Sequence, residues 1–106
     1  MTTFDEREQA FEKKYAHDAE MQFKAEARRD KLLGLWAADL MGMGAEEAED
    51  YAKTVVIADL EEAGDEDVYR KVSADLEAKG VATDGLRAKM AELLAEAKAQ
   101  VMGEIG

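Results

Sequence analysis

The chain has 106 residues, 14 of them Lys or Arg and 25 Asp or Glu, so it is the size of one small domain and carries a formal net charge of -11. This excess of acid opposes binding to nucleic acid or to an anionic membrane surface, because both would repel the chain. With no cysteine, no apolar run long enough to span a membrane and no signal-peptide pattern, the sequence excludes disulfides, thiol chemistry and membrane insertion, and we expect a soluble cytoplasmic protein.

Glycine and proline usage predicts an all-α fold. The chain has no proline, and no glycine precedes Gly34, so the closely spaced turns of β-rich folds are missing. The first helix is predicted to begin at Thr3, whose hydroxyl can cap it together with Glu6, and to continue without interruption to Gly34 or Gly42. We therefore expect a four-helix bundle with a long first helix.

Three further helices are predicted, each with larger apolar residues at steps of three and four. The second covers about residues 45–62. Asp65 is placed to cap the third, which runs to Gly80, and the fourth starts near Thr83 and ends before Gly103. These helices and the end of the first hold most of the larger apolar side chains, so we expect the core there.

The first 31 residues differ from the rest of the chain in composition. They hold six apolar side chains larger than alanine against 15 formal charges. At about 100° per residue, Phe4, Phe11 and Tyr15 share one helical face as an aromatic stripe, which a polar gap separates from the apolar face further along. The stripe is therefore a candidate for docking into a groove of another protein. Two alternatives are that the rings fold back onto the domain, or that the segment is disordered until it binds.

No arrangement of residues indicates catalysis. His17 is the only histidine and has no cysteine or second histidine with which to share a metal. The acidic residues in 59–67 fail the spacing of a calcium loop, because Ala63 and Arg70 occupy its fifth and twelfth places. The glycines on either side of Met43 do not complete a dinucleotide fingerprint. We therefore predict no catalytic residue, no metal site and no cofactor.

The one basic cluster consists of Lys24, Arg28, Arg29 and Lys31. Beside Phe23, such a cluster can hold a phosphate or pack weakly on a base. The alternative is that these cations pair with Glu20, Glu26, Asp30 and the acidic body, because opposite charges three or four residues apart commonly pair on solvated helices.

Five runs of residues carry a family resemblance. They are Met-Thr-Thr-Phe-Asp at 1–5, His-Asp-Ala-Glu-Met-Gln-Phe-Lys at 17–24, Ala-Arg-Arg-Asp-Lys-Leu-Leu-Gly-Leu-Trp-Ala-Ala at 27–38, and the stretches 59–68 and 87–93. Together they closely resemble the zeta subunit of alphaproteobacterial ATP synthase, over almost the entire chain. The central run is specific, since Arg-Arg ahead of Lys-Leu-Leu-Gly-Leu-Trp is not a generic amphipathic pattern.

The resemblance implies an inhibitor of ATP hydrolysis by the rotary enzyme, not an enzyme itself. It implies a four-helix body at residues 19–106 and an inhibitory segment at 1–18 that is flexible when free. That segment would fold to a helix between an alpha and a beta subunit, next to the gamma shaft, and block hydrolytic rotation. The residues expected to contact the partner are Phe4, Arg7, Glu8, Phe11, Lys14, Tyr15 and Asp18.

The resemblance also implies weak binding of ADP or ATP, for which the basic cluster is the candidate site. The free protein is expected to be a monomer, located at the cytoplasmic face of the membrane through ATP synthase. Two other functions stay open: a helical adenine-nucleotide sensor that uses the basic cluster, and a general protein-interaction adaptor.

Overall fold

The computed structural model describes residues 3–61 and 65–105, and within them the side chains other than those of 3–8, 11 and 105. Five helices lie in these ranges and no strand does. They are α1 (Thr3–His17), α2 (Ala19–Leu40), α3 (Ala45–Glu61), α4 (Glu66–Ala78) and α5 (Leu86–Ile105). The all-α prediction is confirmed, and the described ranges contain five helices where four were expected.

The predicted long first helix is wrong, because the chain leaves helical geometry at Asp18. Its backbone is extended, with φ -115° and ψ 102°. The carboxylate Oδ1 of Asp18 accepts hydrogen bonds from the backbone N–H groups of Glu20 at 3.0 Å and Met21 at 3.2 Å. These N–H groups belong to the first turn of a new helix and have no partner within it. Asp18 is therefore the N-cap of α2.

The end of α1 is capped by a side chain as well. The Gln22 amide Nε2 donates to the carbonyl oxygen of Tyr15 at 2.8 Å and to that of Ala16 at 3.3 Å. Carbonyl groups in the last turn of a helix lack intrahelical donors, and the Gln22 amide supplies a donor to two of them. Two side chains thus stabilise the break between α1 and α2.

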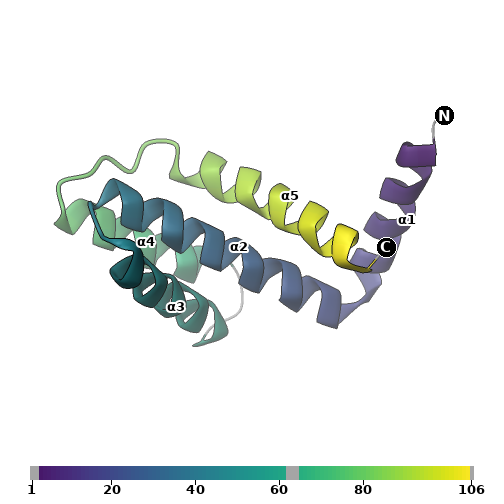
Figure 1. The fold of residues 1–106 in the computed structure, drawn as a ribbon, viewed down its shortest axis with the longest axis horizontal. Coiled ribbons are helices and arrows are strands. Elements are labelled where there is room, and N and C mark those ends of the chain that lie inside the picture. Colours follow the sequence, from purple (N-terminus) through teal and green to yellow (C-terminus); the bar gives the residue numbers. More distant parts are fainter. Residues whose placement is uncertain (1–2, 62–64, 106) are drawn as a thin grey trace.

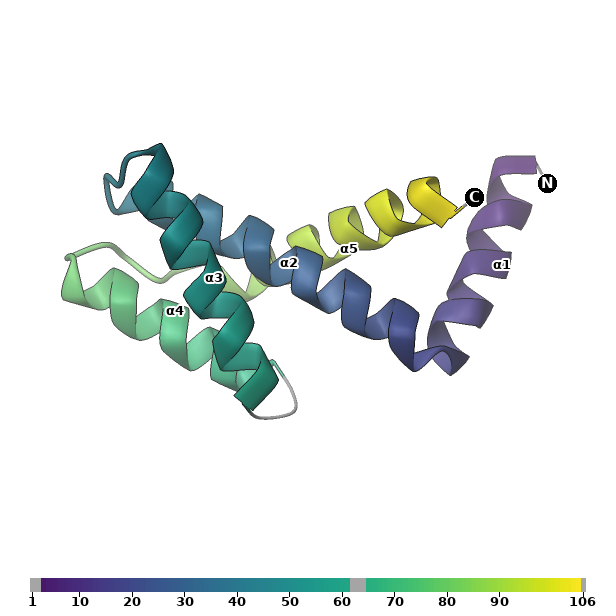
Figure 2. The same cartoon turned by 60° about the horizontal axis from the view of Figure 1, so that its bottom comes forward.

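Helix α2 is the central element of the molecule, which measures 46 × 27 × 26 Å along its principal axes. Helix α5 runs along one side of it, and α3 and α4 lie on the other (Figure 1). Helix α1 turns back from the start of α2, so that it stands beside the C-terminal end of α5 (Figure 2). None of the described helices has the length and apolar character needed to cross a membrane.

The apolar side chains form two separate clusters. The larger one joins α2, α3, α4 and α5 and contains the buried residues Leu33, Ala37, Val55, Val68, Val72, Leu76, Leu86, Met90 and Leu93. The smaller one joins the start of α2 to the end of α5 and contains Met21, Ala25 and Val101, with Tyr15 and Met102 packed against it. The expected core corresponds to the larger cluster.

Two glycines that were expected at helix ends lie inside helices instead. Gly103 lies inside α5, which continues past the predicted end to Ile105. Gly34 lies inside α2, where a Cβ atom would be 2.6 Å from the Cα of Ala52 and 3.3 Å from Cγ2 of Val55. Helix α3 packs against the bare backbone at this point, so Gly34 sets the close approach of α2 and α3.

We predict opposite effects for alanine at these two helical glycines. Gly34→Ala should lower the free energy of unfolding by about 1–3 kcal/mol, because the added methyl group must push the backbone of α3 away. Gly103→Ala, where no atom lies within 4 Å of the added carbon, should leave stability unchanged or raise it by up to about 1 kcal/mol through helix propensity. Urea unfolding followed by circular dichroism measures both. Equal stabilisation by the two substitutions would contradict the close approach.

Candidate functional site

The residues predicted to contact a partner lie in α1 and at the junction that follows it. The backbone of Phe4, Arg7, Glu8 and Phe11 is helical, and their side chains fall outside the described part of the structure. Lys14 is exposed in the last turn of α1. The structure therefore gives these five residues a common helix, and their contact with a partner stays a prediction.

Tyr15 is placed differently, because its ring lies against the body. It is half-buried on the smaller apolar cluster, next to Met21 and Val101. The ammonium Nζ of Lys98 lies 4.3 Å from the centre of the ring. Burial, with the negative charges of Glu26 and then Glu12 nearby, raises the pKa of the Tyr15 hydroxyl. For this ring, the structure shows the fold-back arrangement.

Lys98 and Glu12 complete this contact between α1 and α5. The Lys98 Nζ is 3.7 Å from Oε2 of Glu12, so one ammonium serves both the ring and the carboxylate. Sequence analysis singled out neither residue, and no local pattern marks them, because 86 positions separate them in the chain. Asp18 was expected to contact the partner, and its carboxylate is engaged in capping α2.

The four cations of the basic cluster point to different surroundings. Arg28 pairs with Glu104 of α5 and donates to Gln100 at 3.3 Å. Lys24 lies 3.8 Å from the same Glu104, and Lys31 is exposed. Hydrogen bonding to Arg28 lowers the pKa of the Glu104 carboxyl. Nucleotide binding by this cluster stays a prediction, and Arg28 already has an acidic partner.

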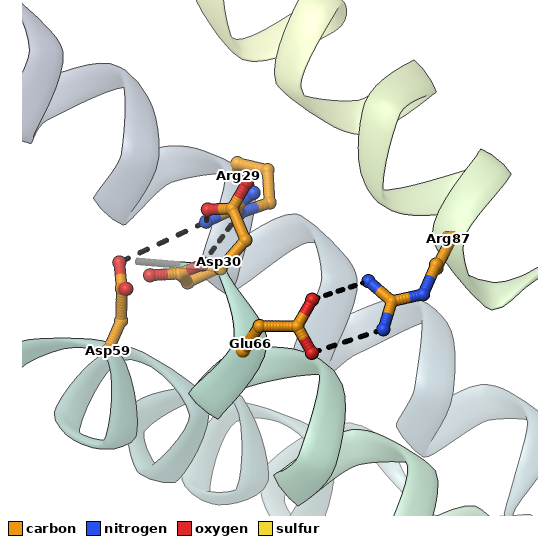
Figure 3. A network of polar contacts seen from close by, with 6 residues as sticks. Arg29, Asp30, Asp59, Glu66 and Arg87 are labelled. Atoms are coloured by element: carbon orange, nitrogen blue, oxygen red, sulfur yellow. Dashed lines mark hydrogen bonds and ion pairs between the residues drawn. The ribbon is translucent and has the colours of Figure 1, made fainter. Parts of the chain in front are cut away.

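Arg29, the fourth cation, is buried at the junction of three helices, with 1% of its surface exposed. Its Nε donates to Oδ1 of Asp30 at 2.7 Å, and its Nη2 donates to Oδ1 of Asp65 at 3.0 Å. The same Nη2 is 4.0 Å from Oδ2 of Asp59 on α3 (Figure 3). Asp65 holds the N-cap position of α4 without making a side-chain cap, because its carboxylate is directed to the guanidinium.

Asp30 retains a proton in this cluster. It is fully buried, and its Oδ2 accepts no hydrogen bond from a donor among the described residues. Burial and a hydrogen bond shared with Asp59 raise the pKa of Asp30 to about 8, against the opposing effect of Arg29. Burial and the charge of Asp59 likewise raise the pKa of Glu26.

A second ion pair lies beside the first and joins α4 to α5. Arg87 binds Glu66 through two parallel hydrogen bonds of 2.8 and 3.1 Å (Figure 3). The guanidinium carbon of Arg87 is 3.9 Å from the centre of the Tyr69 ring. Hydrogen bonding to Arg87 lowers the pKa of Glu66. Within the described ranges, no group of three or more acids and His could hold a metal ion. These polar clusters thus join neighbouring helices to one another.

A family model and a solved structure both match this chain. The family model described as ATPase inhibitor subunit zeta matches residues 1–100. A structure determined by solution NMR is 57% identical in sequence, with a TM-score of 0.70, and the match covers 79% of this chain and 98% of that one. No curated protein gave a significant match.

We predict that Asp30 makes stability fall as pH rises. Between its ordinary value of 3.8 and the value of about 8 in the folded protein, the folded chain keeps a proton that the unfolded chain has lost. Folding therefore takes up a proton in this window, and the free energy of unfolding decreases by up to about 1.4 kcal/mol per pH unit. Below the window both states are protonated, and the effect is absent.

Asp30→Asn provides the matched comparison. The amide keeps an acceptor for Arg29 and a permanent donor for Asp59, but it does not titrate. The difference in free energy of unfolding between the two proteins, measured in urea from pH 5 to 8, should drift in favour of the variant as pH rises. Parallel stability profiles would show that Asp30 takes up no proton on folding.

Proposed function

Because the chain belongs to the ATPase inhibitor subunit zeta family, we propose that it inhibits ATP hydrolysis by a rotary ATP synthase through contact with the catalytic subunits. The family is one of regulatory subunits, not enzymes. The match to residues 1–100 includes α1, the helix that carries the aromatic stripe.

The observation that carries this proposal is the separation of α1 from the body. Helix α1 ends at His17, and the next helix has its own cap at Asp18. In the described part of the chain, the contacts that hold α1 to the body come from its last two turns, at Glu12, Tyr15 and Ala16. The turns that precede them carry Phe4, Arg7, Glu8 and Phe11, the residues proposed to contact the partner.

In the proposed mechanism, α1 inserts between an alpha and a beta subunit next to the gamma shaft and blocks rotation in the hydrolytic direction. Phe4 and Phe11 share a face of α1 and act as apolar anchors, while Arg7, Glu8 and Lys14 pair with charges of the crevice. A segment that is already helical loses less conformational freedom on binding than an unfolded one, so more of the contact energy appears as affinity.

Nothing in the described structure favours the alternative of a nucleotide sensor. Arg29 is buried and hydrogen-bonded to Asp30 and Asp65, and Arg28 is paired with Glu104 across the surface. An incoming phosphate would compete with carboxylates that are already in place. A general adaptor would use α1 in the same way, and only the identity of its partner would differ.

We predict that Phe11→Ala weakens inhibition strongly and Phe23→Ala does not. Each buried aromatic anchor is worth about 2 kcal/mol on truncation, which corresponds to a roughly 30-fold higher concentration for half-maximal inhibition. Phe23 is the matched control, because it lies on α2 with 55% of its surface exposed. ATP hydrolysis by the purified catalytic head, titrated with each variant, gives the measurement.

Removal of residues 1–17 should abolish inhibition while circular dichroism still shows a folded helical body. Full-length protein that leaves hydrolysis unchanged would refute the proposed function. If Phe11→Ala and Phe23→Ala weakened inhibition equally, the surface that contacts the partner would extend beyond α1.

A further inference from the structure

We propose that the face formed by the start of α2 and the end of α5 is a docking surface for the chain's own α1, and that docking there restrains the inhibitory segment. This inference rests on the proposed function of α1. The surface consists of Met21 and Ala25 from α2 with Lys98, Val101 and Met102 from α5.

The floor of this surface is apolar and fits one aromatic ring. Met21 is 5% exposed, and Ala25 and Val101 are fully buried, although they lie outside the larger cluster. The Tyr15 ring covers this floor and is itself half-buried. Moving the ring away would expose apolar surface to water, which gives the docked position a favourable free energy.

Lys98 holds α1 at the rim of the surface. Its ammonium group stands 4.3 Å from the centre of the Tyr15 ring and 3.7 Å from the Glu12 carboxylate. Glu12 and Tyr15 are three residues apart, so they lie on adjacent turns of one face of α1. A single cation from α5 therefore engages two consecutive turns of the segment, and it draws α1 toward the C-terminal end of α5 (Figure 2).

Docking and insertion compete for the same face of α1. Tyr15 lies on the helical face that carries Phe4 and Phe11. If the aromatic stripe binds in a crevice of the partner, the Tyr15 ring must leave its contacts with Met21 and Val101. An exposed ion pair and a cation–ring contact are individually weak, so the docked state is readily reversed. The apparent affinity for the partner is the intrinsic affinity multiplied by the undocked fraction.

The test compares Lys98→Ala with Lys98→Arg and Lys79→Ala in the full-length protein. Lys98→Arg keeps a cation at the rim, and Lys79 is an exposed lysine at the end of α4, so its loss makes the same change in net charge. Amide hydrogen exchange of residues 9–17 in the isolated protein reports docking. The concentration for half-maximal inhibition of ATP hydrolysis by the catalytic head reports restraint.

Lys98→Ala should speed amide exchange in residues 9–17 and lower the half-inhibitory concentration by about three- to tenfold, because it raises the undocked fraction. Both controls should behave as the unmodified protein does. Unchanged exchange in Lys98→Ala would overturn the docking surface, and faster exchange without stronger inhibition would overturn the restraint. If the unmodified protein does not inhibit at all, the proposed function and the restraint fail together, while the exchange data still decide docking.

Discussion

The buried guanidinium of Arg29 is the constraint on which the arrangement of the body depends. It contacts Asp30 on α2, Asp59 near the end of α3 and Asp65 at the start of α4, so one cation ties two helix ends to the middle of a third. Removal of one member of such a buried group leaves an unpaired charge and typically costs about 3–5 kcal/mol. Burial raises the pKa of Asp30 to about 8, and a protonated carboxyl group costs less to bury than a carboxylate does.

The position of this charged cluster along α2 divides the protein into two parts. Leu33 and Ala37 follow it and belong to the larger apolar cluster, which holds α2 to α5 together. Met21 and Ala25 precede it and belong to the smaller one, against which the Tyr15 ring of α1 packs. The helices of the body therefore share the larger cluster, and α1 contacts the smaller one. This is the division that an inhibitor needs if it carries a segment for insertion into a large enzyme.

Much of the fold could be predicted from periodicity, and the errors have local physical causes. The bounds of α3 agree with the prediction to within one residue. The break at Asp18 was missed because a cap competes with helix continuation, and here the Gln22 amide adds a second cap that favours the break. Part of the site was also missed: Lys98 and Glu12 meet only after α1 has folded back.

The sequence by itself determined the helical class, the poverty of the first 31 residues in apolar side chains and the family to which the chain belongs. These follow from composition, spacing and local motifs, which act between near neighbours in the chain. Only the tertiary structure decided which acid each cation meets, that Gly34 admits the backbone of α3, and that Tyr15 lies beneath Lys98. Such contacts join residues far apart in the sequence, and their energies depend on burial and distance, which no local pattern specifies.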